Sequence, residues 1–324
     1  MFDVVALGEV LIDFTPCGIS ENNNPLFERN PGGAPANVLT ALSRLGAKTA
    51  IIGKVGNDQF GIFLKDCLAG NNVDVTGLAM SDSMNTTLAF VHLDGNGDRS
   101  FSFYRNPGAD MMLMHSDIPE QIIERSGIFH FGSLSLTNEP VRGATLKALK
   151  IARDNGLIIS YDPNLRPPLW KSLDDARLEI RRGLDYADVL KISEEELLFI
   201  TNESDLEKGS RMLSEMGISL IFITLGPKGT FFRHGNDTGK LDTYDVKVVD
   251  TTGAGDAFLA GILYKLRGKT RRDMAWLSKA EMEQMTDFAN AAGALTTTRK
   301  GAIPAVPSLE EVYHCLECIP KLIL

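Results

Sequence analysis

The chain has 324 residues, of which 44% are hydrophobic and 23% are charged, the composition of an ordinary globular protein. Its formal net charge of −9 gives little electrostatic support for a nucleic-acid-binding role, although backbone amides and a few lysines can still attract an anionic nucleotide. The apolar runs are short and interrupted, so no segment is predicted to cross a membrane, and the acidic start "MFDVVALGEV" predicts a strand rather than a signal peptide.

Strands and helices are predicted to alternate along most of the chain. "DVVALGEVLIDF" (3–14) predicts the first strand, and "APANVLTALSRLG" (34–46) predicts a helix that ends near Gly46. The same rhythm predicts strands at 48–56, 126–134, 157–164, 187–193 and 220–226 and helices at 58–72 and 141–156. Strands separated by helices indicate an α/β fold with a mostly parallel central sheet flanked by helices.

One segment breaks this rhythm. "TTLAFVHLDGNGDRSFSFYR" (86–105) contains two alternating runs joined by "DGNGD" (94–98), which predicts a β-hairpin. With part of 11–30 it is expected to form a small separate sheet, a lid sub-domain from about 11–31 and 85–108 that excludes water from a site beneath. A hairpin without such a function is the alternative. No repeat or long linker divides residues 1–324, so a single domain is expected.

The cysteines give no strong signal for a metal or redox site. Cys315 and Cys318 form a C-x-x-C pair with only His314 nearby, whereas a zinc site requires a second pair of ligands. Cys17 and Cys67 lie far away in the sequence. The pattern favours two thiols on one helix face and is typical of a reducing cytoplasm.

The stretch "VVDTTGAGDAFLAGIL" (248–263) carries the strongest chemical signal. "VKVVDT" (246–251) predicts a strand, and a helix is expected to follow and to end near Gly268. The glycines between them allow close backbone approach, and the free amides of a helix start bind anions. Asp256 would repel a phosphate there, so we interpret it as a general base that deprotonates an attacking hydroxyl. Helix capping is the alternative role.

Two better-known phosphate motifs do not fit this stretch. The P-loop pattern G-x-x-x-x-G-K-[ST] is absent from the chain. The dinucleotide fingerprint G-x-G-x-x-G fails because position 258 is Phe, which disfavours a dinucleotide-dependent oxidoreductase.

Two further groups of residues are candidates for ligand binding. Gly32 and Gly33 precede a helix that carries Asn37 one turn in, and Asp13 is expected at the end of the first strand, where short polar side chains suit sugar hydroxyls. On the other side, "ADVLKISEEEL" (187–197) and "LIFITLGPKGTFF" (220–232) are expected to end at the same sheet edge. Their candidates are Lys191 for phosphate, Glu196 for hydrated Mg²⁺, and Thr224, Gly226 and Lys228 for a nucleotide. The alternative for Glu194, Glu195 and Glu196 is the acidic first turn of a helix.

Two signatures make the chain similar to the ribokinase-like (PfkB) sugar kinases. "DTTGAGDAF" (250–258) resembles the C-terminal signature of that family, and "PGGAPANV" (31–38) resembles its N-terminal signature. The resemblance runs from about residue 3 to about residue 315. Within the family it is greatest to the fructokinases of the plant and bacterial type, through "FYRNPGADMML", "FHFGSLSLTNEP", "YDPNLRPPLW", "KISEEEL" and "TTTRKGAIPA".

The resemblance implies a role for each matched residue. The catalytic base is matched by Asp256, and the anion hole by Gly253, Ala254 and Gly255. The sugar-binding positions are matched by Asp13, Gly32, Gly33, Asn37, Arg105 and Arg166. The nucleotide-binding positions are matched by Lys191, Ser193, Glu196, Thr224, Gly226, Gly229 and Asn290, with Ser193 replacing the Asn of the family's N-x-x-E motif. The positions of a monovalent cation, commonly K⁺, are matched by Asp250, Thr252 and Gly301.

The resemblance also implies an activity, ATP-dependent phosphorylation of D-fructose at its 6-hydroxyl, with Mg²⁺ and K⁺ as the metal ions. A related kinase acting on 2-keto-3-deoxygluconate, ribose or a nucleoside is one alternative, and a catalytically inactive sugar-sensing protein is another. The implied fold is ribokinase-like, with a small β-sheet lid through which many members form homodimers. The expected partners are a small sugar and ATP, with no nucleic acid or membrane.

Overall fold

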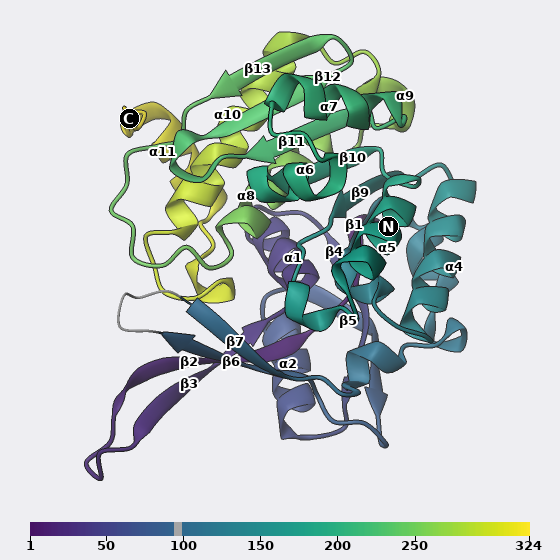
Figure 1. Cartoon of the computed structure of the whole chain (residues 1–324), viewed down its shortest axis with the longest axis vertical. Coiled ribbons are helices and arrows are strands. Elements are labelled where there is room, and N and C mark those ends of the chain that lie inside the picture. Colours follow the sequence, from purple (N-terminus) through teal and green to yellow (C-terminus); the bar gives the residue numbers. More distant parts are fainter. Residues whose placement is uncertain (94–98) are drawn as a thin grey trace.

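The computed structural model describes residues 1–93 and 99–324. Within them, nine strands form the central sheet. These strands are β1 (Phe2–Leu7), β4 (Thr49–Gly56), β5 (Val73–Ser81), β8 (Ser126–Gly132), β9 (Ile158–Asp162), β10 (Val189–Ser193), β11 (Leu220–Thr224), β12 (Thr230–His234) and β13 (Asp237–Leu241). Their order is β13-β12-β11-β10-β9-β8-β1-β4-β5, and all neighbours from β11 to β5 run parallel. The antiparallel hairpin of β12 and β13 extends one edge (Figure 1).

Helices cover both faces of this sheet. On one face the apolar core includes residues of α1 (Ala34–Arg44), α2 (Gln59–Gly70), α8 (Ala254–Leu266) and α10 (Lys279–Thr296). On the other it includes residues of α3 (Glu120–Glu124), α4 (Val141–Asp154), α5 (Leu173–Leu184), α6 (Glu194–Thr201) and α7 (Leu206–Glu215). The short α9 (Arg271–Met274) precedes α10. Helix α11 (Leu309–Cys318) packs against α10.

The strand sequences explain this layering. Side chains alternate between the faces of a strand, so Val4 and Ala6 of β1 enter the first core and Val5 and Leu7 enter the second. Both sets are fully buried, which requires the continuous apolar run that a central parallel strand shows.

A second, smaller sheet projects from the lower side of the body in Figure 1. We call it the lid sheet; it consists of β2 (Leu11–Ile19), β3 (Pro25–Gly32), β6 (Leu88–Leu93) and β7 (Arg99–Tyr104), in the order β3-β2-β6-β7. The β6–β7 pair is antiparallel, as predicted, and the segment at 11–30 joins it because β2 pairs with β6. The turn predicted at 94–98 lies outside the described residues. Phe14 of β2 stacks on Phe90 of β6, with ring centroids 4.7 Å apart.

The single first strand predicted for 3–14 is wrong. The chain forms β1 and β2, which belong to different sheets, with a break between Leu7 and Leu11. At this break Gly8 packs so closely on the first turn of α1 that a Cβ would lie 2.5 Å from Pro35 Cγ. Asp13 therefore lies in the lid sheet and not at the end of a central strand.

The strand predicted for 246–251 is also wrong. Residues 246–250 form no strand, and the N–H groups of Val249 and Asp250 both donate to the carbonyl of Thr297 instead. Val248 and Val249 are exposed, so the apolar run that suggested a strand has no sheet to pack on. The helix that follows does begin at 254 and is succeeded by Gly268, in the left-handed region at φ 72°.

The cysteines lie as the sequence suggested. Cys315 is buried on α11 and Cys318 is exposed at its end, and both are free thiols. Burial raises the pKa of Cys315 to about 11, which makes this thiol unreactive at neutral pH. In the part of the chain that the structure describes, no helix has the length and apolar character needed to span a bilayer.

Candidate active site

The turn at 253–256 is built as an anion site. Gly253 precedes α8 in the left-handed conformation at φ 77°, and a Cβ there would lie 2.7 Å from Ala302 Cβ. Among the described residues, no side chain caps the helix, and the N–H groups of Gly255 and Asp256 have no acceptor. Unpaired amides at a helix start attract anions, so the structure supplies the feature that the glycine pattern predicted.

Asp256 is not the helix cap. It lies one turn into α8, and its Oδ2 accepts a hydrogen bond of 2.8 Å from Asn37 Nδ2 of α1. Burial raises the pKa of Asp256 to about 6, against the opposing charge of Lys191. A carboxylate with this pKa is still ionised at pH 7 and is a better base than an ordinary aspartate.

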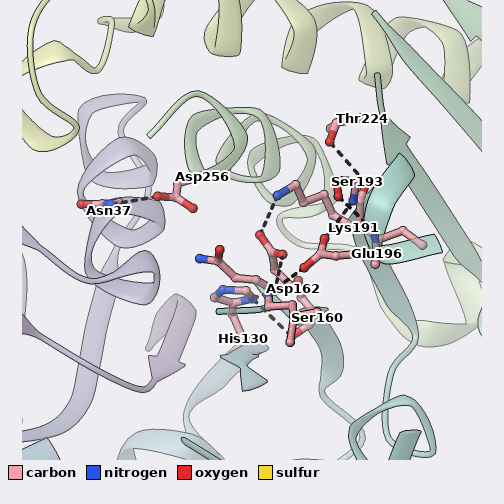
Figure 2. A network of polar contacts seen from close by, with 12 residues as sticks. Asn37, His130, Ser160, Asp162, Lys191, Ser193, Glu196, Thr224 and Asp256 are labelled. Atoms are coloured by element: carbon pink, nitrogen blue, oxygen red, sulfur yellow. Dashed lines mark hydrogen bonds and ion pairs between the residues drawn. The ribbon is translucent and has the colours of Figure 1, made fainter. Parts of the chain in front are cut away.

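Lys191 connects this turn with a second carboxylate. Its Nζ lies 2.9 Å from Asp162 Oδ2, and the two side chains are only 10% and 3% exposed. A Cβ on Gly255 would lie 2.8 Å from the same Nζ, so the ammonium group sits directly against the first turn of α8. Burial lowers the pKa of Lys191, but the charges of Asp162, Glu196 and Asp256 outweigh it and raise the pKa overall. Figure 2 shows these side chains together.

The lid sheet supplies Asp13. Its carboxylate lies over Gly32, where a Cβ would come within 2.1 Å of Asp13 Oδ2, and Gly33 adopts φ 108° with its Cα against the backbone of Glu9. Burial raises the pKa of Asp13 to about 6; the charge of Arg166 lowers it and that of Asp256 raises it. Asp13, Arg166 and Asp256 are therefore close enough to interact, although they come from three distant segments.

The two predicted arginines differ in their surroundings. Arg166 is exposed, and its side chain makes one hydrogen bond to the described residues, to the neighbouring carbonyl of Leu165, which leaves its charge available to a ligand. Arg105 is buried, and its guanidinium bonds to Asp110, Thr137 and the carbonyl of Leu134. A direct contact of Arg105 with the sugar stays a prediction.

On the predicted nucleotide side, β10 and β11 end together, with Ser193 opposite Thr224. Ser193 and Glu196 form a reciprocal capping box at the start of α6, and the other oxygen of Glu196 accepts from the N–H of Leu165. The acidic run at 194–196 is thus the first turn of a helix, the alternative the sequence left open. The carboxylate of Glu196 is nonetheless held beside Lys191.

The remaining predicted nucleotide residues have local structural roles. Gly226 and Gly229 adopt positive φ angles of 57° and 84° on either side of a short turn. Asn290 is buried; it accepts from Thr230 and donates to the carbonyls of Leu241 and Asp242, so it ties α10 to the β12–β13 hairpin. A contact of Asn290 with a nucleotide stays a prediction.

The residues predicted for a monovalent cation come together. Asp250 Oδ1 accepts from the N–H and hydroxyl of Thr252, and its Oδ2 accepts from the N–H of Gly301 at 2.9 Å. One carboxylate thus joins two loops beside the start of α8. In the described residues no group of three or more His, Cys, Asp or Glu side chains is arranged to hold a metal ion.

Sequence reasoning assigned no role to Asp162, which the structure places at the centre of the site. It ends β9 and pairs with Lys191 on the adjacent strand β10. The signal was available, since Asp162 follows the apolar run "LIISY", and ligands of parallel sheets bind at the carboxyl ends of strands. His130, whose Nδ1 lies 3.2 Å from both oxygens of Ser160, was also missed; burial lowers its pKa to about 4, so it is neutral.

Comparison with known proteins agrees with this geometry. The family model "pfkB family carbohydrate kinase" matches residues 1–309. The chain is 46% identical over 318 residues to the probable fructokinase-6, chloroplastic, of Arabidopsis thaliana, covering 97% of this chain and 82% of that protein. The ATP-bound fructokinase of Xylella fastidiosa superposes with a TM-score of 0.91 at 33% identity, over 98% of this chain and 99% of that one.

A second solved relative is a double mutant of the fructokinase from Vibrio cholerae O395, in a form with fructose, ADP and potassium ion bound. Its TM-score is 0.87 at 36% identity, over 97% of this chain and 98% of that one. The fold and the site define a sugar-phosphorylating enzyme of the ribokinase-like type. The chain belongs to the PfkB family of carbohydrate kinases, which confirms the family and fold predicted from its two glycine signatures.

Proposed function

We propose that this protein is an ATP-dependent fructokinase that converts D-fructose to D-fructose 6-phosphate. The observation that carries the proposal is the position of Asp256, which is held by Asn37 beside amides of the α8 start that have no acceptor in the described residues. A half-buried carboxylate next to an anion site suits a base that receives a proton while a phosphoryl group is transferred. An inactive sugar sensor would not need this carboxylate.

The sugar is proposed to lie between the lid sheet and α1. Gly32 and Gly33 leave room for it, and Asp13 offers two acceptor oxygens to neighbouring hydroxyls. Asn37 Oδ1 is buried without a partner among the described residues, which leaves it able to accept a hydroxyl of the substrate. The charge of Arg166 faces Asp13 and Asp256 and is placed to meet the phosphoryl group as it reaches the sugar.

The proton and the phosphoryl group then move in opposite directions. Asp256 accepts the proton of the 6-hydroxyl while the hydroxyl oxygen bonds to the γ-phosphorus of ATP and ADP leaves. The N–H groups of Gly255 and Asp256, which have no acceptor among the described residues, stabilise charge on the phosphoryl oxygens together with Lys191. A positioned base contributes about 10²–10⁴-fold to the rate.

ATP is proposed to lie along the ends of β10 and β11, over the nucleotide positions already described. Asp162, Glu196 and Asp256 share one ammonium group, so negative charge is in excess at this edge and suits a divalent cation. Mg²⁺ bound with ATP would neutralise the phosphates, and Asp162 and Glu196 are the nearest carboxylates to hold its water shell. K⁺ is proposed to bind where Asp250 joins the loops of Thr252 and Gly301.

The lid sheet is proposed to close over the sugar and to exclude water from the transferred phosphate. Its strands also expose large apolar side chains, Ile19 on β2, Leu26 on β3 and Tyr104 on β7. We propose a homodimer that buries these residues. Light scattering is expected to give twice the chain mass, and Leu26→Asp is expected to shift the population to single chains.

A substrate panel with coupled detection of ADP tests the proposed function. Fructose, 2-keto-3-deoxygluconate, ribose and a nucleoside are compared at equal ATP and Mg²⁺, with and without K⁺. The proposal predicts the highest kcat/KM for fructose and NMR signals of the 6-phosphate. A higher kcat/KM for another acceptor would replace fructose by that substrate, and no phosphorylation at all would favour a sensor.

A further inference from the structure

All four strands of the lid sheet join the body beside two buried carboxylates. Glu9 precedes β2 by two residues, and its Oε1 accepts the N–H of Ala34, just after β3. On the other side, β6 follows Thr87 directly and β7 is followed directly by Arg105. Both of these residues bond to Asp110, which lies in the short 3₁₀ helix η1 (Ala109–Met112) and is 5% exposed.

Asp110 uses both of its oxygens at this junction. Its Oδ1 accepts the hydroxyl of Thr87, and its Oδ2 lies 2.7 Å from Arg105 Nε. Arg105 continues into the body through hydrogen bonds to the hydroxyl of Thr137 and to the carbonyl of Leu134. One buried carboxylate thus holds both ends of the β6–β7 hairpin to the central fold.

Gly108 gives a second, independent sign that this contact is specific. A Cβ on Gly108 would lie 1.9 Å from Thr87 Oγ1 and 2.8 Å from Asp110 Oδ1. The φ of Gly108 is −90°, which any residue can adopt, so the position requires space rather than glycine's conformational freedom. The backbone of Gly108 therefore passes directly beside the hydrogen bond between Thr87 and Asp110.

The other carboxylate belongs to the same group of charges. Burial raises the pKa of Glu9 to about 7, while the charge of Arg105 lowers it and that of Asp110 raises it. The ends of β2 and β3, held by Glu9, therefore interact with the ends of β6 and β7 through the guanidinium of Arg105.

The junction connects directly to the proposed sugar site. The carbonyl of Thr87 accepts the N–H of Ile12, and the β2–β6 register continues with Asp13 opposite Ala89. Any shift of Thr87 therefore moves the strand that carries Asp13.

We propose that Asp110 is a positioning residue that fixes the lid sheet, and with it Asp13, over the sugar site by anchoring Thr87 and Arg105. The role in sugar binding rests on the proposed function, whereas the anchoring does not. Arg105 then acts through the lid junction rather than on the sugar itself.

The test compares Asp110→Asn with Asp117→Asn in the full-length chain. Asp117 is a matched control because it also pairs with a cation, Lys54 at 2.8 Å, but bonds to no lid strand within the described part of the chain. Loss of a hydrogen bond to a charged group is typically worth a factor of about 10–100, so the fructose KM of Asp110→Asn should rise by about tenfold or more while the ATP KM stays within about twofold. Asp117→Asn should leave both constants within about twofold.

Hydrogen–deuterium exchange supplies a readout that does not depend on activity. In Asp110→Asn the amides of β6 and β7 should exchange about tenfold faster or more, while those of β10 and β11 are unchanged. Thr87→Val, which removes one of the two links, and Gly108→Ala, which changes no charge, should show the same lid-selective effect.

Two results would overturn the proposal. One is an unchanged fructose KM with unchanged exchange in the lid; the other is equal acceleration in the lid and central sheets, which would show a general loss of stability. Lid-selective exchange in a chain whose unsubstituted form does not phosphorylate fructose would support the anchoring and contradict only the proposed function.

Discussion

Asn37 and Asp256 are 219 positions apart in the chain, yet Asn37 Nδ2 donates to Asp256 Oδ2 across 2.8 Å. Each residue lies in the first turns of a helix, α1 and α8, and these helices are packed in the same core. The other end of the Asn37 amide, Oδ1, is buried and has no partner among the described residues. The side chain of Asn37 is therefore able to orient Asp256 through Nδ2 and to accept a hydrogen bond from the sugar through Oδ1.

The Asn37→Leu variant tests this double role. The hydrogen bond from Asn37 lowers the pKa of Asp256, so its loss should raise that pKa and move the acid limb of the rate profile to higher pH. A hydrogen bond to a charged group is worth about 1.5–3 kcal/mol, so kcat/KM should fall by about 10–100-fold. Thr40→Val, at another buried position of α1 whose hydroxyl has no partner in the part of the chain described, is the control and should change neither quantity by more than about twofold. Equal effects of the two variants would contradict a specific role for Asn37.

Gly32→Ala tests whether sugar binding depends on the position of the Asp13 carboxylate over Gly32. The added Cβ would lie 2.1 Å from Asp13 Oδ2 and must displace that carboxylate. We expect the fructose KM to rise by about tenfold or more, the cost of one misplaced hydrogen bond to a charged group, with the ATP KM unchanged. Gly70→Ala, whose Cβ would meet no atom within 4 Å, is the control and should leave the kinetics unchanged. A normal fructose KM for Gly32→Ala would remove Asp13 from the sugar site.

Lys191→Met tests the buried pair of Lys191 and Asp162. The substitution leaves the Asp162 carboxylate buried without its partner, which typically costs about 3–5 kcal/mol in the free energy of unfolding. Adding Asp162→Asn should recover part of this stability, because the carboxylate that pairs directly with Lys191 is then neutral, while Glu196 and Asp256 keep their charges. The double variant should stay inactive if Lys191 meets the phosphates. Recovery of both stability and turnover, measured by denaturant unfolding and ADP release, would limit Lys191 to a structural role.

The pH dependence of the rate tests the state of the base. Burial raises the pKa of both Asp256 and Asp13 to about 6. Only the ionised form of Asp256 can accept a proton, so kcat should be constant above about pH 7 and fall as the pH drops through 6. An aspartate at its ordinary pKa of about 3.9 would keep the rate constant down to about pH 5. Circular dichroism at each pH distinguishes loss of activity from unfolding. A rate that stays constant to pH 5 would contradict the raised pKa of Asp256.

The parts of the fold that the sequence predicted correctly depend on local signals. The helix at 34–44 is preceded by glycine and begins with alanine and proline, and the chain turns at Gly46 in the left-handed conformation at φ 92°. The anion site at 253–256 was predictable because its function requires backbone amides, which the glycines and the helix start indicate. The expected joining of part of 11–30 to the hairpin at 86–105 is confirmed by the pairing of β2 with β6.

The wrong strand predictions concern segments whose structure is determined by packing against distant parts of the chain. Nothing in "VVALGEVLIDF" marks a change of sheet, which follows from the packing of Gly8 against Pro35 and from the hydrogen bond between Glu9 and Ala34. The apolar run at 246–251 resembles a strand, but its amides at Val249 and Asp250 donate to the carbonyl of Thr297, the residue that follows α10. Strand β5 was not predicted, because its sequence "VDVTGLAMS" alternates poorly.

Prediction of the site from the sequence was limited in the same way, by contacts between distant segments. The sequence could name Lys191 and Arg105 as cations, but not that Asp162 and Asp110 pair with them, because these pairs form between separate segments. A relative named as chloroplastic shows that family membership does not determine location, so the cytoplasmic location stays a prediction.

The most direct test of the account is the turnover of Asp256→Asn at saturating fructose and ATP. Asparagine keeps the shape and can bond to Asn37 but cannot accept the proton, so kcat should fall by about 10²–10⁴-fold while fructose binding stays within a few-fold. Asp245→Asn, at an exposed position on the segment that leads to α8, is the control and should retain full activity. If Asp256→Asn kept a kcat close to that of the unsubstituted chain, Asp256 would not be the base and the proposed mechanism would be wrong.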